Sequence, residues 1–388
     1  MAKIARVAVK DRDLLKTLRG FFKTLLSKGK MDAVLVPCRL PMKPVLMPTL
    51  LSDPAGLDHA DPLSPAFPLN AARIAARLTR RPGGGKIAAV MRPCEIRAFV
   101  ELVKLKQGRP EDLVMIGIDC LGACRNRDYA RWSARAGDNA AEAYARAVLA
   151  GETPPEDFEP ADACRICEFP TAEAADLSVA LYGVDVEKHV LIEAATEKGK
   201  AVLKQLGLPT AEMPPARAKT LQQLVEQRRA ERDRVFEETR SAVDDLEKLS
   251  RYLADCVNCY NCRVACPVCY CRECVFTTDV FDHEPAQYLK WAEKKGALKL
   301  PTDTLFYHLT RLTHMSTACV GCGQCSNACP NDIPLTPLFR LVARDTQAAF
   351  NYQAGRDITE KPPLAEFRDV EFEEVVGLGA DETAEMEK

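Results

Sequence analysis

The residues with the clearest chemistry in this sequence are its 17 cysteines, eleven of which fall between Cys256 and Cys329. One spacing, Cys-x2-Cys-x2-Cys-x3-Cys-Pro, occurs twice there, ending at Pro267 and at Pro330. In this arrangement three closely spaced thiolates hold one 4Fe-4S cluster, and the fourth, ahead of proline, binds the other cluster. The spacing predicts site one on Cys256, Cys259, Cys262 and Cys329. It predicts site two on Cys319, Cys322, Cys325 and Cys266.

Seven further cysteines have spacings that suit a metal. Cys120-x3-Cys124 and Cys164-x2-Cys167 offer four thiolates, and spacing alone leaves zinc or a third 4Fe-4S cluster open. We favour the cluster, because two others lie downstream. Between the two repeated motifs lie three more cysteines, which form either a fourth cluster or spare thiols: Cys269, Cys271 and Cys274.

Cys94 is a further candidate ligand, because it is predicted at a helix start, where the helix dipole lowers a thiol pKa. Zinc in place of iron is disfavoured at the repeated motifs, since structural zinc usually takes two separated Cys-x2-Cys pairs. His308 and His314, in the insert between the motifs, are expected to pack as ordinary helix residues. Ligation or tuning of a cluster is the alternative for them. No nucleophile–His–acid arrangement is evident, so no catalytic residue is assigned.

Composition limits the remaining possibilities. The odd cysteine count and the charged N-terminus argue against a secreted disulfide framework. The sequence contains no apolar run of membrane-spanning length, because Val34–Leu51 is broken by charges and prolines. A net charge of −2 does not favour nucleic-acid binding. We therefore expect a cytoplasmic, oxygen-sensitive protein of an anaerobic system.

The elements that must position these cysteines differ between the two halves. Residues 1–213 alternate strand and helix, which favours an α/β domain with a largely parallel sheet. The expected strands are Ala33–Val36 (ended by Pro37), Lys86–Met91 and Leu113–Ile118. The expected helices are Asp13–Ser27, Ala71–Thr79 and Pro93–Leu105. Ligands collect beyond the carboxyl ends of parallel strands, where Cys94 and Cys120 are predicted to lie.

The second half is predicted to be helical. Residues 214–254 contain a long stretch without Gly or Pro, Arg217–Leu253, which predicts one helix or two nearly continuous ones linking two domains. Residues 255–355 then form a mostly helical dicluster ferredoxin domain, because 52 residues, including helix-like Gln287–Lys295 and Thr302–Thr313, separate Cys266 from Cys319. Residues 356–388 read as an acidic, extended tail.

Several sequence blocks resemble a known family. They are "MRPCEIRAFVELVKLKQ", "VMIGIDCLG" and "CRICEFPTAEAADLSV", followed by "EKHVLIEAATEKGKAVL". Their order and spacing, over about Leu14–Gly207, resemble the β subunits of coenzyme F-420-reducing hydrogenases and formate dehydrogenases. The second half, with "CVGCGQCSNACPNDIP", resembles helical dicluster ferredoxin modules of heterodisulfide reductases and succinate dehydrogenases.

The resemblance implies an α/β flavoprotein domain that carries FAD and one 4Fe-4S cluster, and a redox complex with a formate dehydrogenase or hydrogenase catalytic subunit. The matching blocks imply cofactor contacts by Arg92, Pro93, Glu95, Asp176, Ser178 and Gly183. The family is rich in glycine at two segments where this chain is not. This chain has Leu18–Phe21 at the first segment and Val179–Gly183 at the second. That departure keeps open a flavin-free relay to a heterodisulfide-reductase-like partner. A zinc-bound structural scaffold is the third and least favoured function.

Overall fold

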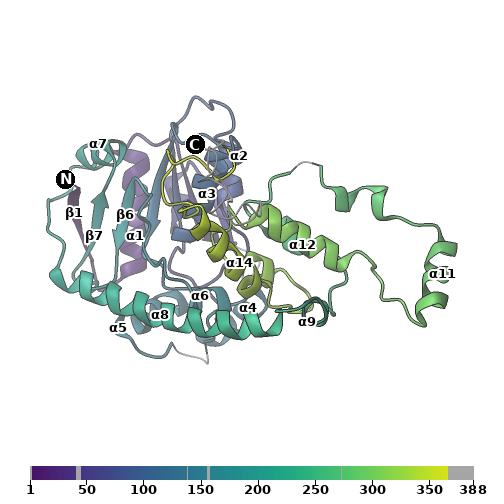
Figure 1. Ribbon diagram of the computed structural model, residues 1–388. Helices are drawn as coiled ribbons and strands as arrows, with labels where there is room; N and C mark the ends of the chain where they lie inside the picture. The colour runs from purple at the N-terminus through teal and green to yellow at the C-terminus, as the bar shows by residue number, and fades with distance from the viewer. Residues whose placement is uncertain (1, 41–44, 138, 155–157, 272, 366–388) are drawn as a thin grey trace, which may run out of the picture.

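The computed structural model describes residues 2–40, 45–137, 139–154, 158–271 and 273–365. Its N-terminal part contains a seven-stranded sheet with helices on both faces, and its second part is helical (Figure 1). The predicted fold class, an α/β domain followed by a long helical linker and a mostly helical cluster domain, is confirmed.

The sheet is largely parallel at its centre. Its strand order is β1-β7-β6-β5-β4-β2-β3. β2, β4, β5 and β6 run parallel, whereas β3, β7 and β1 are joined antiparallel at the two sides. The carboxyl ends of the parallel strands therefore meet at one edge. The strands are β1 Lys3–Ala8, β2 Ala33–Arg39, β3 Leu46–Leu51, β4 Ile87–Met91, β5 Leu113–Ile118, β6 Leu177–Ala180 and β7 His189–Ala194.

The three helices predicted in the α/β part, α1, α2 and α3, begin within one residue of the prediction. α1 starts after Asp13, whose carboxylate accepts a hydrogen bond from the Lys16 amide at 2.6 Å. α3 starts at Pro93, which suits the first turn because proline has no amide hydrogen to leave unpaired. The helices here are α1 Leu14–Ser27, α2 Ala72–Leu78, α3 Pro93–Lys104, α4 Asn126–Ala136, α5 Ala140–Ala150, α6 Asp162–Arg165 and α7 Glu197–Leu206, with the short 3-10 helix η1 Pro54–His59.

The central strands are buried on both faces, as expected for parallel strands covered by helices. Along β4, Val90 packs into one apolar core with residues of α1, α5 and α7. The next residue, Met91, packs into a second core with residues of α2 and α3. This second core continues into the helical part, where it includes Tyr307 and Phe339. The two halves of the chain therefore share one hydrophobic core.

One strand boundary differs from the prediction. β2 continues past Pro37 to Arg39, because its parallel pairing with β4 involves only Ala33–Leu35. On its other side Pro37 lies opposite Pro48 of β3. A proline is tolerated there because the ladder does not require its missing amide hydrogen.

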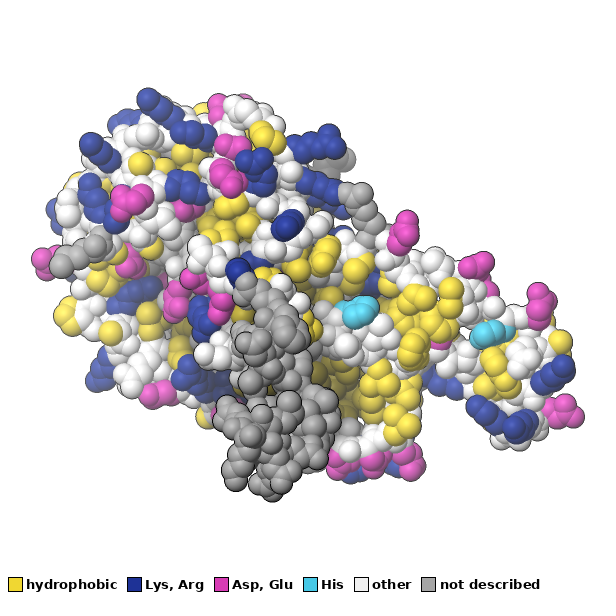
Figure 2. All heavy atoms as spheres, turned by 45° about the horizontal axis from the view of Figure 1, so that its top comes forward, with side chains coloured by type: hydrophobic (Ala, Val, Ile, Leu, Met, Phe, Trp, Pro, Cys, Tyr) yellow, Lys and Arg dark blue, Asp and Glu magenta, His cyan; other side chains and the backbone are white. Residues whose placement is uncertain are grey.

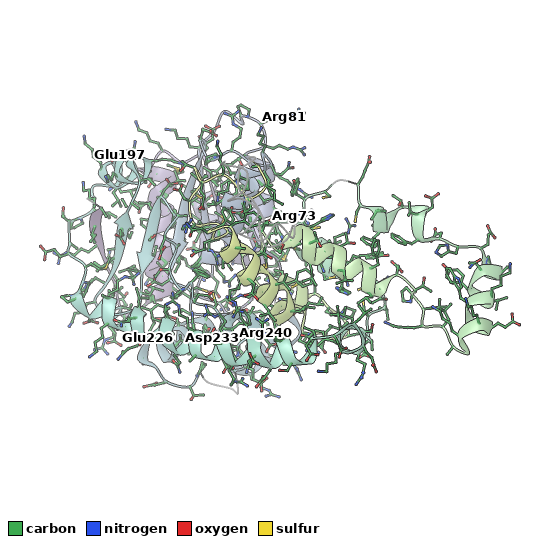
Figure 3. The ribbon with its side chains drawn as sticks, in the orientation of Figure 1. Arg73, Arg81, Glu197, Glu226, Asp233 and Arg240 are labelled. Atoms are coloured by element: carbon green, nitrogen blue, oxygen red, sulfur yellow. The ribbon has the colours of Figure 1, made fainter. Side chains whose placement is uncertain are left out.

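The helical part begins with two nearly continuous helices, as predicted. α8 is long and mostly solvent-exposed, with only Arg217, Phe236 and Thr239 buried, and Figure 3 labels charged residues along it. The predicted apolar stripe is therefore covered only in part, with Leu221 and Leu224 half-buried. The elements are α8 Pro215–Ala242, α9 Leu246–Tyr252, α10 Asn261–Ala265, η2 Val275–Thr277, η3 Asp279–Phe281, α11 Pro285–Lys295, α12 Thr304–Met315, α13 Gln324–Asn327 and α14 Leu335–Ala349.

The insert between the cysteine motifs forms a projecting arm, residues 270–303, that ends at α11 (Figure 1). None of the residues of α11 is buried. Exposed apolar side chains lie along this region, and Figure 2 shows them among charged ones. They include Val275, Val280, Leu289 and Leu300.

The described end of the chain returns to the α/β part. Tyr352 and Ala354 are buried, and the Gly355 amide donates a hydrogen bond to Glu101 of α3 at 2.7 Å. The predicted tail lies mostly in residues 366–388, outside the described residues. Among the described helices, none is both long enough and apolar enough to span a membrane.

Candidate functional site

Site one lies in the loop before α10. All four of its predicted ligands, Cys256, Cys259, Cys262 and Cys329, line one cavity of about 330 Å³. Asn258 and Tyr260, between the first three cysteines, have positive φ angles of 48° and 59°. This left-handed backbone turns the loop so that successive thiols can face one space. Cys329, which comes from the second motif, enters the same cavity.

Site two is buried between α10, α13 and the α/β part. Burial raises the pKa of the Cys266 thiol to about 11, and the nearby Cys319 adds to that shift. Burial and three neighbouring thiols raise the pKa of Cys322 well above its usual value: Cys266, Cys325 and Cys319. Cys266, from the first motif, thus lies with the three leading cysteines of the second motif. The exchange of fourth cysteines between the motifs agrees with this geometry.

Glycines allow site two to sit close to its neighbours. Gly321 and Gly323 have φ angles of +70° and +79°. A Cβ on Gly321 would lie 2.6 Å from Arg340 Nε, and one on Gly323 would lie 2.4 Å from the Ala163 Cβ. Only glycine fits both the backbone conformation and the space at these positions. These two glycines therefore allow site two to lie directly against α6 and α14.

A third group of thiols lies at the carboxyl edge of the sheet. Burial raises the pKa of Cys94 well above its usual value, and Cys120 and Cys322 are the next largest causes. Burial, then Cys120 and Cys167, raise the pKa of Cys164 to about 12. We define site three as Cys94, Cys120, Cys164 and Cys167. These thiols come from the first turn of α3, the end of β5, α6 and the residues after α6.

Cys124, which the sequence pairs with Cys120, lies in a different environment. Its Sγ is 3.7 Å from the carbonyl oxygen of Pro65. Burial raises its pKa to about 12, and the charged groups that contribute are Asp128 and Arg92 rather than other thiols. The hollow it lines includes Trp132 and Phe158 and no second cysteine among the described residues.

The remaining predicted ligands, Cys269, Cys271 and Cys274, lie between the two repeated motifs in the chain. Cys269 lies near both Cys271 and Cys274, and burial raises its pKa. Cys271 is exposed. Among the residues that the structure describes, no three His, Cys, Asp or Glu side chains converge as one metal ion requires. A cubane cluster spreads its four thiolates over four irons, so the thiol groups fit clusters better than single zinc ions.

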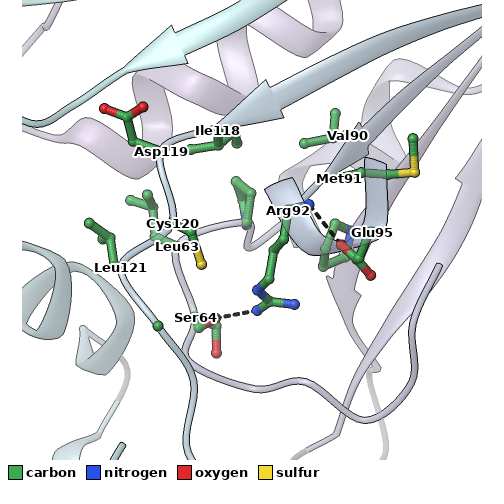
Figure 4. Close-up of a pocket in the computed structure, with 13 residues that line it drawn as sticks. Leu63, Ser64, Val90, Met91, Arg92, Glu95, Ile118, Asp119, Cys120 and Leu121 are labelled. Atoms are coloured by element: carbon green, nitrogen blue, oxygen red, sulfur yellow. Dashed lines mark hydrogen bonds between the residues drawn. The ribbon is translucent and has the colours of Figure 1, made fainter. Parts of the chain in front are cut away.

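A small hollow opens beside site three, at the ends of β4 and β5 (Figure 4). Cys120 forms part of its wall, together with Arg92 and Glu95. The Arg92 guanidinium donates to the carbonyl oxygens of Ser64 and Ala66, at 3.0 and 2.5 Å. The Glu95 carboxylate accepts the Arg92 amide at 2.8 Å, and burial raises the pKa of this carboxyl group. The hollow thus combines apolar walls with an anchored cation.

The other residues implied as cofactor contacts lie away from this hollow. Asp176 accepts hydrogen bonds from the Met115 amide and the Thr196 hydroxyl, at 2.9 and 2.6 Å. Ser178 donates to a carbonyl oxygen, and a Cβ on Gly183 would lie 2.4 Å from the Arg217 Cα. Pro93 begins α3. The first turn of α3 places Arg92 and Glu95 together at the hollow, whereas Asp176, Ser178 and Gly183 make their contacts within the protein.

Several arginines beside the thiols carry no signal in the sequence. Arg311 of α12 donates to the Cys262 Sγ at 3.1 Å. Arg228 of α8 donates to the Cys167 carbonyl oxygen at 3.3 Å. Arg97 of α3 donates to the carbonyl oxygens of Val320 and Ala354, which lie in the second half of the chain. Asp119, directly before Cys120, forms a buried ion pair with Arg217.

Comparisons with known proteins match both halves. Residues 84–209 match the family described as the C terminus of the coenzyme F420 hydrogenase/dehydrogenase beta subunit. Residues 252–333 match the 4Fe-4S dicluster domain. The F420-dependent formate dehydrogenase subunit beta of Methanocaldococcus jannaschii is 27% identical over 368 residues, covering 89% of this chain and 92% of that protein.

Two further proteins are similar. The F420-dependent formate dehydrogenase 1 subunit beta of Methanococcus maripaludis is 27% identical over 389 residues, covering 89% and 91%. A chain of the F420-reducing NiFe hydrogenase complex from Methanosarcina barkeri is 14% identical with a TM-score of 0.45, covering 63% of this chain and 94% of that chain. The resemblance found in the sequence is confirmed: residues 84–209 match the coenzyme F420 hydrogenase/dehydrogenase beta subunit model, residues 252–333 match the 4Fe-4S dicluster domain, and the chain is similar to F420-dependent formate dehydrogenase β subunits over most of its length.

Proposed function

We propose that the chain is the iron–sulfur electron-transfer subunit of a formate dehydrogenase or hydrogenase complex. In this role it links the catalytic subunit to another electron carrier. The observation that carries the proposal is the unbroken series of thiol groups, from site one through site two to site three and the adjoining hollow. Each cluster exchanges one electron at a time, so neighbouring clusters form a path for electrons.

Two contacts support the continuity of this path. Thiols of both sites raise the pKa of the Arg311 guanidinium. Cys262 belongs to site one, and Cys266 and Cys325 belong to site two. Cys322 of site two is among the groups that raise the pKa of Cys94, a proposed ligand of site three. Sites one and two are therefore neighbours, and sites two and three are neighbours across the boundary between the two halves.

For site three we propose the ligands Cys94, Cys120, Cys164 and Cys167, with Cys124 outside the set. Binding to iron removes the thiol protons, so the raised pKa values of Cys94, Cys120 and Cys164 are overcome by the metal. Arg92 and Arg228 both lie near this group and offset part of its negative charge. The buried arginines thus suit a site that becomes anionic when loaded.

We further propose a flavin in the hollow beside Cys120. Apolar side chains line it, and its position at the carboxyl ends of β4 and β5 is where ligands bind in such sheets. When bound there, a flavin exchanges electron pairs with a two-electron carrier and single electrons with clusters. Arg92 would face it as a cation, Glu95 would hold the first turn of α3 through the Ala71 and Arg92 amides, and Cys120 would connect it to site three. A deazaflavin carrier is the substrate class that the related proteins' names support.

A flavin-free relay to a heterodisulfide-reductase-like subunit is the second candidate function. It is supported by Asp176, Ser178 and Gly183, whose polar groups and space are taken up within the protein. In this version the hollow is empty of flavin, and site three passes its electrons directly to the partner. The two versions differ in one measurable quantity, the amount of FAD per chain.

The proposal is tested by purifying the chain without oxygen, together with its catalytic subunit, and measuring iron, sulfide and FAD. Three clusters correspond to about twelve iron atoms per chain, and a fourth on Cys269, Cys271 and Cys274 raises that number to about sixteen. One FAD per chain supports the flavin, whereas full iron without flavin supports the relay. Zinc without acid-labile sulfide contradicts both versions.

Electron transfer is tested on the same complex. Formate or hydrogen should bleach the visible absorption of the clusters when the catalytic subunit is active. If that subunit reduces a dye while the clusters of this chain stay oxidised, the proposed role is wrong.

A further inference from the structure

Helix α12 lies between the two cysteine motifs in the sequence and covers site one in the structure. Six of its side chains are buried, with exposed fractions between 0 and 8%: Thr304, Tyr307, His308, Arg311, Leu312 and Met315. On the opposite face Phe306 is 56% exposed. Four of the six buried side chains carry a polar group, which is unusual for the buried face of an amphipathic helix.

Three of these polar groups, on Tyr307, His308 and Arg311, point at ligands of site one, whereas the Thr304 hydroxyl donates to the Pro301 carbonyl oxygen. The His308 Nε2 lies 3.3 Å from the Cys256 Sγ. The Tyr307 hydroxyl lies 3.2 Å from the Cys262 Sγ. The Arg311 Nη1 donates to the same sulfur at 3.1 Å, and its Nη2 donates to the Cys262 carbonyl oxygen at 3.2 Å. Two thiols of site one thus receive three contacts from a single helix.

Arg311 has no other charge to balance it. Among the described residues no carboxylate forms an ion pair with it, and its Nε has no hydrogen-bond partner. Its guanidinium instead lies over the Phe339 ring, 4.6 Å from the centroid. A buried cation is costly unless an anion compensates it. The thiolates of sites one and two are the anions within reach.

Site two has donors of another kind. Backbone amides of Val268, Gly321 and Gln324 hydrogen-bond the thiols of Cys266, Cys319 and Cys322. Among side chains, the Thr336 hydroxyl lies 3.5 Å from the Cys325 Sγ. Its Cys266 contacts the Met315 sulfur of α12 at 4.0 Å, which is a weak interaction. Arg311 donates its hydrogen bond to a site-one sulfur, although its positive charge also acts on the thiols of site two.

We propose that α12 raises the reduction potential of the cluster at site one. Donors and a positive charge at the thiolates stabilise the reduced, more negative cluster, and hydrogen bonding to the sulfurs is a recognised determinant of cluster potential. This inference rests on the proposed function, since it requires a cluster at site one. Tyr307, His308 and Arg311 act here as positioning residues.

The test is a redox titration of the full chain without oxygen, followed by electron paramagnetic resonance. Arg311→Gln should lower the potential of one cluster by at least a tenfold change in its one-electron equilibrium, which is about 59 mV. Tyr307→Phe, which removes a single oxygen atom, should lower the same potential by a smaller amount. Cys259→Ser identifies the signal that belongs to site one. Arg251→Gln removes an exposed charge from α9 and should change no potential.

The inference fails if Arg311→Gln and Tyr307→Phe keep their iron and leave every potential at the value found in Arg251→Gln. It also fails if the site-two potential falls more than the site-one potential. If Arg311→Gln loses iron, Tyr307→Phe alone decides the outcome. A chain that binds no clusters contradicts the proposed function itself, and the iron content measured beforehand distinguishes that failure.

Discussion

Sites one and two differ from site three in how the chain brings their thiols together. At sites one and two each quartet takes three cysteines from one short loop and one from the other motif. At site three no single short segment supplies three thiols, because they come from α3, the end of β5 and the segment around α6. At sites one and two a local turn brings three of the four thiols together, whereas site three exists only when the sheet has folded.

The surroundings of the sites differ in the same way. Site one is covered by α12, which belongs to the insert between its own motifs. Site three is surrounded by side chains from distant elements, Arg92 after β4 and Arg228 of α8. We therefore expect mutations in the α/β part to affect site three while sites one and two keep their clusters. Four predictions test this, beginning with the largest effect.

The largest effect is expected from the ligands themselves. Cys94→Ser should remove about four iron atoms per chain and interrupt transfer between site two and the hollow, because a cubane needs all its thiolates. Cys124→Ser should keep the full iron content, because Cys124 lies apart from the other thiols. Iron analysis of both proteins after anaerobic reconstitution decides this. Loss of iron in Cys124→Ser, but not in Cys94→Ser, would reverse our assignment.

The second prediction concerns the ion pair that holds the start of site three. The Arg217 Nη2 donates to the Asp119 carboxylate at 2.9 Å, and the same carboxylate accepts the Leu181 and Tyr182 amides. Arg217→Met leaves a buried carboxylate unpaired, which should lower the free energy of unfolding by about 3–5 kcal/mol. Because Asp119 precedes Cys120, site three should lose iron first.

Urea unfolding without oxygen and iron analysis measure this effect. Arg229→Met is the matched control, because Arg229 is an exposed arginine of the same helix. If Arg217→Met unfolds like the control, the ion pair does not stabilise site three.

The third prediction concerns the contact that Arg97 of α3 makes with the second half of the chain, which we call the joint between the two halves. Arg97 is buried, and its guanidinium donates to the carbonyl oxygens of Ala354 and Val320 and lies 3.7 Å from the Phe169 ring centroid. Arg97→Met leaves these carbonyls unpaired, and we expect a loss of about 3 kcal/mol. Electron transfer between sites two and three should slow, while all clusters remain bound. Rapid-mixing absorbance kinetics measure the rate, and an unchanged rate with reduced stability would show that the joint does not control transfer.

The smallest effect is expected at the edge of the same joint. The Tyr352 hydroxyl donates to Glu101 at 2.6 Å and accepts from Lys104 at 2.8 Å. Tyr352→Phe should therefore lower the free energy of unfolding by about 1.5 kcal/mol. Tyr288→Phe on α11 should have no effect, since its hydroxyl makes no hydrogen bond to any described residue. Equal stabilities of these two variants in urea would contradict the prediction.

Most of the fold and the two repeated motifs could be read from the sequence. The predicted strands Lys86–Met91 and Leu113–Ile118 and the helix Pro93–Leu105 are confirmed within two residues, because apolar periodicity and proline position are local signals. The end of β2 was wrong, since pairing with β3 and β4 decides where Pro37 is tolerated. Ordinary packing was the favoured expectation for His308, yet its Nε2 lies 3.3 Å from the Cys256 Sγ.

The sequence by itself determined what is local: the spacing of the eight motif cysteines, the alternation of strand and helix, and the long helical linker. These depend on neighbouring residues and on the periodicity of burial. Only the tertiary structure decided which distant thiols meet, because Cys94 joins Cys120, Cys164 and Cys167 through the order of strands in the sheet. It also decided which arginines face the thiols, because a buried charge is placed by the elements packed around it and leaves no pattern in the chain.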